Sequence, residues 1–244
     1  MPEHVLAVNG SPRADKGIVD LVLQRFLAGC RNAGATTETL YLSKLNIEAC
    51  KGELGCFFTQ RKTCEVFPND DGNAAVAAFA AADRVVLASP LHVYGISSHL
   101  VRFAERLISL GAPELAVNDG VWTHPGSTKP HRPCAVVGVC AFPGAHNFVL
   151  FREIMTTLQK VFWLAPSGSV LVPMSRDLSF LDPRHPRHAE HVRILSASER
   201  AGEEFMRDGA IAPETEREIS RPTAAMETLI EAFEGYFSAL RTRA

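Results

Sequence analysis

The residues best suited to chemistry lie in a short polar loop near the N-terminus. Asn9-Gly10-Ser11-Pro12-Arg13 follows an apolar run, and Gly17 and Ile18 then lead into an amphipathic helical pattern. A strand, a tight loop and a helix N-terminus direct free backbone N–H groups to one point, which favours phosphate binding. Ser11 adds a hydroxyl, and Arg13 adds a planar guanidinium that can donate two parallel hydrogen bonds. The loop therefore predicts an anion site, although Asn-Gly and Ser-Pro also occur in ordinary turns.

This loop lacks the signatures of two common nucleotide sites. No Gly-Lys-Ser/Thr sequence closes it, so it is not a Walker A loop. It also has no Gly-x-Gly-x-x-Gly, so the dinucleotide fingerprint is absent. The phosphate must belong to another kind of ligand.

The elements around the loop predict an α/β fold with a doubly wound, five-stranded parallel sheet. Apolar runs separated by helical patterns indicate strands buried on both faces. The predicted strands are 4–9, 36–42, 84–89, 134–141 and 168–173. Ligands of such sheets bind at the carboxyl ends of the strands, where the strand order reverses. The loops 9–18, 89–98 and 141–147 all fall at that edge, and the long loop 111–131 is expected to be functional.

The chain length and the later segments indicate the domain organisation. The 244 residues predict one domain over residues 1–210 with a helical extension over 211–244. The extension is expected to pack on the same domain or at an oligomer interface. Its apolar side chains, together with Phe148, Phe151, Phe162 and Trp163, exceed what one sheet face requires, which predicts a homodimer or homotetramer.

Composition excludes several classes of partner. The formal net charge of −2 gives no basis for binding nucleic acid or an anionic membrane. No apolar run reaches the ~20 residues of a membrane span, and no signal-peptide pattern precedes the first strand. We therefore expect a cytoplasmic protein.

Two motifs in this order resemble the NAD(P)H-dependent FMN reductase and multimeric flavodoxin family. The first is Asn9 to Arg13 after the first strand, and the second is Ser89-Pro90-Leu91-His92-Val93-Tyr94-Gly95 after the third. The resemblance covers about residues 4–175. It implies a flavodoxin-like fold with strand order 2-1-3-4-5, with FMN as the cofactor and its phosphate in the first loop.

The resemblance also implies which residues hold the cofactor. Ser11 and Arg13 would bind the phosphate, with backbone N–H groups from Gly17 and Ile18. The ribityl chain and ring would be lined by Pro90, Leu91, His92, Val93, Tyr94 and Gly95, and Gly144 would close the third side. Many relatives have a hydroxyl residue where Ile18 stands and an aromatic residue where His92 stands.

The implied activity is that of an oxidoreductase. NADPH or NADH would give a hydride to N5 of FMN, and electrons would then pass to a quinone, a flavin, a nitro compound or a metal ion. The flavin is the catalyst, with His92 and Tyr94 expected near its reactive face. Two alternatives stay open: a flavodoxin-type electron carrier for a protein partner, and a flavodoxin-fold binding protein that has lost FMN. The low net charge argues against the carrier.

Three cysteines in the irregular segment 43–72 raise the question of a metal. The related iron–sulfur flavoproteins hold a cluster with four cysteines in this region. Here Cys50, Cys56 and Cys64 are separated by five and seven residues and offer only three thiolates, where a cluster typically needs four. We expect no metal site, either here or at His185, His188 and His191, which Pro183 and Pro186 interrupt.

Overall fold

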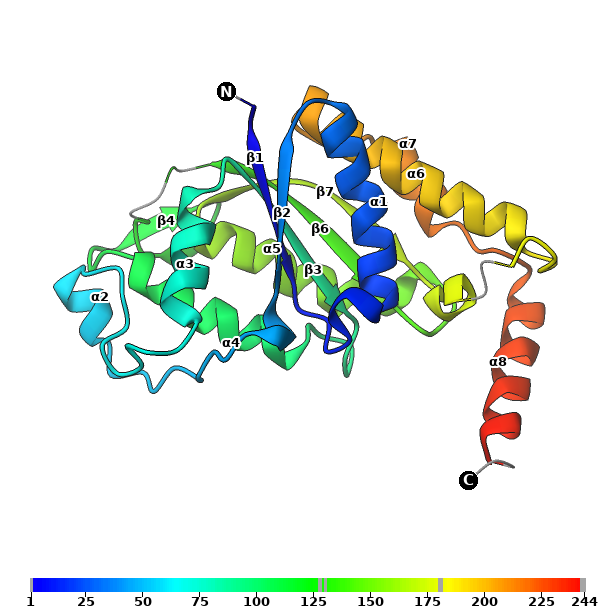
Figure 1. Cartoon of the computed structure of the whole chain (residues 1–244), viewed down its shortest axis with the longest axis horizontal. Helices are drawn as coiled ribbons and strands as arrows, with labels where there is room; N and C mark the ends of the chain where they lie inside the picture. The colour runs from blue at the N-terminus through cyan, green and yellow to red at the C-terminus, as the bar shows by residue number, and fades with distance from the viewer. Residues whose placement is uncertain (1, 127–128, 130, 180–181, 242–244) are drawn as a thin grey trace.

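The fold centres on a five-stranded parallel sheet with strand order β2-β1-β3-β6-β7 (Figure 1). The computed structural model describes residues 2–126, 129, 131–179 and 182–241. The strands are β1 (His4–Asn9), β2 (Thr36–Tyr41), β3 (Arg84–Pro90), β6 (Arg132–Val139) and β7 (Leu164–Val172). Numbered among themselves, they have the order 2-1-3-4-5, so the predicted flavodoxin-like sheet is confirmed.

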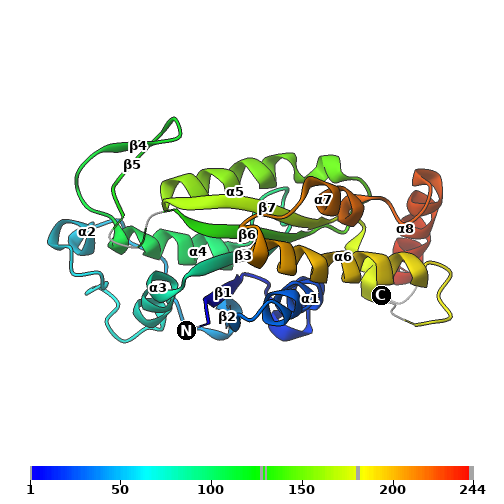
Figure 2. The same cartoon turned by 90° about the horizontal axis from the view of Figure 1, so that it is seen from above.

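Helices cover both faces of this sheet (Figure 2). On one face lie α1 (Ile18–Asn32) and α6 (His188–Arg207), and on the other lie α3 (Gly72–Ala81), α4 (Ser98–Arg106) and α5 (Val149–Val161). Alternate residues of β1 enter the two cores: Val5 and Ala7 pack with α1 and α6, whereas Leu6 and Val8 pack with the other three helices. This double burial explains why the strands read as continuous apolar runs.

Glycines allow α1 and α6 to cross at very short range. A β-carbon on Gly29 would collide with the carbonyl group of Glu199, and one on Gly202 would collide with the carbonyl group of Phe26. The thiol of Cys30 also donates to the carbonyl oxygen of Gly202, at 3.6 Å. The C-terminal half of α1 is therefore held against α6 by backbone-to-backbone packing.

Two regions differ from the sequence prediction. The long loop 111–131 contains a hairpin of β4 (Ala116–Asn118) and β5 (Val121–Thr123), which projects from the body in Figure 2. The fifth strand of the sheet begins at Leu164 rather than at residue 168, and its pairing with β6 is irregular between Cys134 and Val136. Pro166 falls inside this strand, which is tolerated because β7 lies at the edge of the sheet.

The C-terminal extension is helical, as predicted. It consists of α7 (Pro213–Ser220) and α8 (Met226–Arg241), and α8 stands apart from the sheet in Figure 1. Residues 242–244 lie outside the described chain. A helical turn at Leu42–Lys44 leads into the segment 43–72, which also contains the short helix α2 (Gly55–Thr59).

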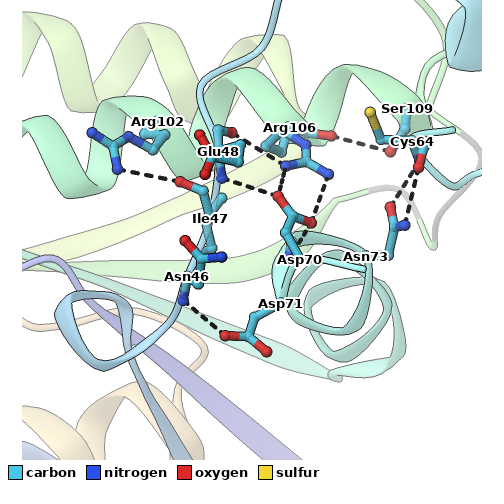
Figure 3. Close-up of polar contacts among 11 residues, drawn as sticks. Asn46, Ile47, Glu48, Cys64, Asp70, Asp71, Asn73, Arg102, Arg106 and Ser109 are labelled. Atoms are coloured by element: carbon cyan, nitrogen blue, oxygen red, sulfur yellow. Dashed lines mark hydrogen bonds and ion pairs between the residues drawn. The ribbon is translucent and has the colours of Figure 1, made fainter. Parts of the chain in front are cut away.

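A buried ion pair fastens the segment 43–72 to α4 (Figure 3). Arg106 Nη2 lies 3.2 Å from Asp70 Oδ1, and these side chains are only 2% and 4% exposed. Arg106 Nη1 also donates to the carbonyl oxygen of Glu48, at 3.2 Å. Burial alone would raise the pKa of Asp70, but hydrogen bonds from Arg106 and from the N–H groups of Glu48 and Gly72 outweigh it and lower the pKa.

Candidate active site

The first loop takes its shape from Asn9 at the end of β1. Its Oδ1 accepts a hydrogen bond from the N–H of Ser11 at 2.9 Å, and its Nδ2 donates to Oδ1 of Asp20 at 3.3 Å. Ser11 Oγ then accepts from the N–H of Arg13, at 3.3 Å. Asn9, Ser11 and Asp20 are all buried. The strand end, the loop and the first turn of α1 therefore form one hydrogen-bonded unit.

The second loop is locked to the first through Ser97. The hydroxyl of Ser97 donates to the carbonyl oxygen of Gly10 at 2.6 Å and caps α4 by accepting from the N–H of Leu100 at 3.3 Å. The N–H of Ser97 donates to Ser89 Oγ, at 2.9 Å. A β-carbon on Gly10 would lie only 2.7 Å from Ser97 Oγ, so this joint requires glycine.

These loops open onto a cleft of about 310 Å³ at the carboxyl edge of the sheet. Of the predicted residues, Ser11, Arg13, Gly17, Ile18, Pro90, Leu91 and His92 line it. Other lining residues were not predicted; these are Pro12, Val19, Val139, Ala141 and Ser175. Ser175 lies after β7, and its N–H donates to the carbonyl oxygen of Cys140. No local sequence pattern indicates this contact, so Ser175 was not predicted.

Val93, Tyr94 and Gly95 form a tight turn beside the cleft rather than its lining. His92 and Gly95 exchange backbone hydrogen bonds of 3.0 and 2.8 Å. Val93 and Tyr94 both have positive φ values, 47° and 60°, and Val93 is 97% exposed. A β-branched residue in this region is strained, and such strain concentrates at ligand sites.

The third loop approaches the same turn from the end of β6. The ring of Phe142 lies parallel to that of Tyr94, with centroids 6.5 Å apart and an interplanar angle of 11°. Phe142 also contacts Phe233 of α8, at 5.4 Å between centroids. Gly144 is buried with φ of 92°, and a β-carbon there would collide with His146. Aromatic rings thus connect the second loop, the third loop and α8.

The end of the cleft that the first loop forms has the donors that an anion needs. Ile18 and Val19 begin α1, so their N–H groups have no acceptor within the helix, and the helix dipole places partial positive charge there. Arg13 and Ser11 both line the cleft. Space for a phosphate beside them depends on Gly17, where a β-carbon would lie 3.0 Å from Ser11 Oγ. These residues fit a bound phosphate group.

The cysteine segment lies away from this cleft. Cys56 and Cys64 are buried, and burial raises the pKa of Cys56, with further increases from Cys64, Glu53 and Cys50. Over the described ranges, no three His, Cys, Asp or Glu side chains are grouped so that they could hold a metal ion.

The first two loops of this cleft lie in a part of the chain that matches a known protein family. The model of the NADPH-dependent FMN reductase family matches residues 4–141, which is more than half of the chain and includes the first two loops. The chain belongs to the NADPH-dependent FMN reductase family. The resemblance seen in the two motifs is thereby confirmed, together with FMN as the cofactor, a reduced nicotinamide nucleotide as the electron donor and an oxidoreductase activity.

Solved structures similar to this reductase share its fold at low sequence identity. An FMN-dependent NADH-azoreductase from Bacillus anthracis str. Ames Ancestor, in complex with FMN, has 15% identity and a TM-score of 0.61, covering 85% of this chain and 99% of that one. An NAD(P)H:quinone oxidoreductase from Methanothermobacter marburgensis has 16% identity and a TM-score of 0.58, covering 84% and 98%. No curated protein matches the reductase. In the part of the chain that is described, every helix is too short or too polar to span a membrane.

Proposed function

We propose that this reductase takes electrons from NADPH or NADH and delivers them to a small acceptor such as a quinone, a flavin, an azo or nitro compound or a metal ion. The observation that carries the proposal is the cleft itself, which combines a cationic phosphate end with an apolar end. The azoreductase and quinone oxidoreductase activities printed for its structural neighbours support this class of acceptor.

At the phosphate end, Ser11 and Arg13 hold the phosphate of FMN. Arg13 donates through a planar fork that suits phosphate oxygens, and the N–H groups of Ile18 and Val19 donate from the helix N-terminus. Ile18 contributes only its backbone, because its side chain has no hydroxyl. Asp15 would oppose a phosphate, but Lys44 lies 3.0 Å from its carboxylate and lowers its pKa, so this negative charge is paired.

At the ring end, the second loop forms the wall beside the flavin. Pro90 and Leu91 exclude water from one side, and His92 brings an imidazole to the same wall. Tyr94 and Gly144 lie outside the lining of the cleft and would flank the ring from the second and third loops. When bound, FMN supplies the hydride and electron chemistry, so the protein needs no catalytic acid or base of its own. The side chains bind the cofactor, orient it and limit solvent access.

The assignment is tested by Arg13→Ala with Arg25→Ala as the matched control. Arg25 is an exposed arginine of α1 outside the cleft lining. We expect the Arg13 variant to bind FMN at least about tenfold more weakly, because it loses a charge-assisted hydrogen bond. FMN fluorescence titration measures this affinity, and equal affinities for both variants would contradict the site. Rapid-mixing reduction of the FMN-loaded protein by each nicotinamide then tests turnover, and no reduction would favour an electron carrier.

A further inference from the structure

A second pocket, of about 290 Å³, lies between α8 and the segment that leads from β7 to α6 (Figure 1). Its lining combines aromatic and cationic side chains. Phe233 and Tyr236 of α8 line it together with Arg176, His185 and Arg187. All of these residues lie beyond residue 141, where the family match ends. The pocket therefore belongs to a part of the chain that the family model does not match.

This pocket adjoins the cleft at the carboxyl edge of the sheet. Ser175 lines the cleft, whereas its neighbours Met174 and Arg176 line the pocket, and consecutive Cα atoms are about 3.8 Å apart. Phe142 of the third loop also contacts Phe233 of the pocket, with 5.4 Å between ring centroids. A long ligand with one end in the cleft can therefore place its other end in the pocket.

The α8 side of the pocket offers flat surfaces for a purine ring. The guanidinium carbon of Arg176 lies over the ring of Tyr236, 3.3 Å from its centroid. Phe233 lies one turn before Tyr236 on the same helix, and both rings are only partly buried. Bases stack on aromatic rings and on the planes of arginine guanidinium groups. These side chains therefore suit the adenine that every nicotinamide nucleotide carries.

The segment before α6 brings positive charge to the pocket. Arg187 is the N-cap of α6, so the positive end of the helix dipole lies beside it. The N–H of Arg187 donates to His185 Nδ1 at 3.2 Å. In the neutral imidazole the proton is then on Nε2, which is a donor. Two guanidinium groups, an imidazole donor and a helix N-terminus thus meet at this pocket.

Two carboxylates that flank these cations in the sequence are paired with other arginines. Arg184 Nη2 donates to Asp182 Oδ2 at 2.7 Å, and this bond lowers the pKa of Asp182. Arg193 Nε donates to Glu190 Oε2, also at 2.7 Å. Each guanidinium has five N–H donors, so Arg187 can keep other partners and still donate two parallel hydrogen bonds to a phosphate. The pocket therefore suits a phosphate group beside adenine.

We propose that this pocket binds the adenine ring and the 2′-phosphate of NADPH, and that the reductase therefore prefers NADPH to NADH. This rests on the proposed function, in which a nicotinamide nucleotide reduces FMN in the adjoining cleft. Arg187 and His185 hold the phosphate, and Arg176 with Tyr236 holds the adenine. NADH has the same adenine but no 2′-phosphate, so the cationic side of the pocket favours only NADPH.

Steady-state kinetics with a quinone at a fixed saturating concentration test the preference. The wild type should have a kcat/KM for NADPH about tenfold or more above that for NADH, because charged donors hold the additional phosphate. Arg187→Ala should raise the KM for NADPH about tenfold more than the KM for NADH. Arg207→Ala is the matched control, since Arg207 is an exposed arginine at the other end of α6. An equal KM for NADPH in the two variants would overturn the proposal.

The nucleotide 2′,5′-ADP tests the pocket without turnover, because it carries adenine and the 2′-phosphate but no nicotinamide. On the FMN-saturated wild type, isothermal titration should show 2′,5′-ADP binding about tenfold or more tightly than 5′-AMP, which lacks only that phosphate. Arg187→Ala should remove the difference, and Arg207→Ala should keep it. Equal affinities of the two nucleotides for a wild type that binds FMN would overturn the pocket alone. A wild type that does not bind FMN would overturn the proposed function and the pocket together.

Discussion

The hydroxyl of Ser97 donates to the carbonyl oxygen of Gly10 at 2.6 Å, so one hydrogen bond joins the loop that follows β1 to the loop that follows β3. The same oxygen accepts the N–H of Leu100 and caps α4. One side chain therefore sets both the separation of the two loops and the start of the helix behind them. Cleft geometry and helix stability are coupled at this residue.

Replacing Ser97 by Ala should weaken both properties. Loss of the cap and of the bond to Gly10 should lower the free energy of unfolding by about 1–3 kcal/mol, because the buried carbonyl oxygen loses its donor. Urea denaturation measures this change, and FMN titration should show weaker binding. The neighbouring Ser98→Ala, at an exposed position, is the control. Equal stability of the two variants would show that the hydrogen bonds of the Ser97 hydroxyl do not stabilise the fold.

Ile18→Thr should tighten FMN binding. The position begins α1 beside Ser11 and Arg13, and a hydroxyl there adds a donor toward the phosphate. One additional hydrogen bond of ordinary strength corresponds to about a fivefold gain in affinity. Isothermal titration with FMN measures it, with Leu21→Thr, one turn further along α1, as the control. An unchanged affinity in Ile18→Thr would mean that the phosphate lies elsewhere.

The Asp70–Arg106 pair should govern stability in acid. The folded-state pKa of Asp70 is lowered, so its ionised form stabilises the fold. This contribution to the free energy of unfolding is fully present above the unfolded pKa of about 3.9 and is lost as the pH falls through the lower folded pKa. Arg106→Met should cost about 3–5 kcal/mol at neutral pH, since it leaves a buried carboxylate unpaired. Thermal unfolding between pH 2 and 7 tests this, and an unchanged acid limb in Asp70→Asn would contradict it.

Gly29→Ala should force α1 and α6 apart. The new methyl group meets the backbone of Glu199, which cannot move aside as a flexible side chain would. The overpacking should cost about 1–3 kcal/mol. Gly235→Ala on α8 is the matched control, because nothing lies within 4 Å of a β-carbon there. Calorimetry of the two variants should show a lowered Tm for Gly29→Ala only.

The sheet and the position of the cleft were predictable because each follows from a local pattern. Strands buried on both faces are apolar throughout, as in Val85 to Ala88, and the edge rule for parallel sheets places their loops together. The contact of Ser97 with Gly10 depends on how two segments far apart in the sequence meet, which no local pattern encodes. The hairpin at 116–123 has strands of only three residues within a segment rich in Gly and Pro. Pro166 and Gly168 are residue types that seldom occur inside strands, so the sequence prediction started β7 too late.

The aromatic contact between Phe142 and Phe233 links the tail of the chain to the ring site. The phosphate end depends on α1 and on the first loop, which α8 does not form. If the proposed function holds, changes on α8 should alter the range of accepted molecules while cofactor retention stays constant. Laboratory libraries confined to Phe233 and its neighbours on α8 offer the same route to new acceptors.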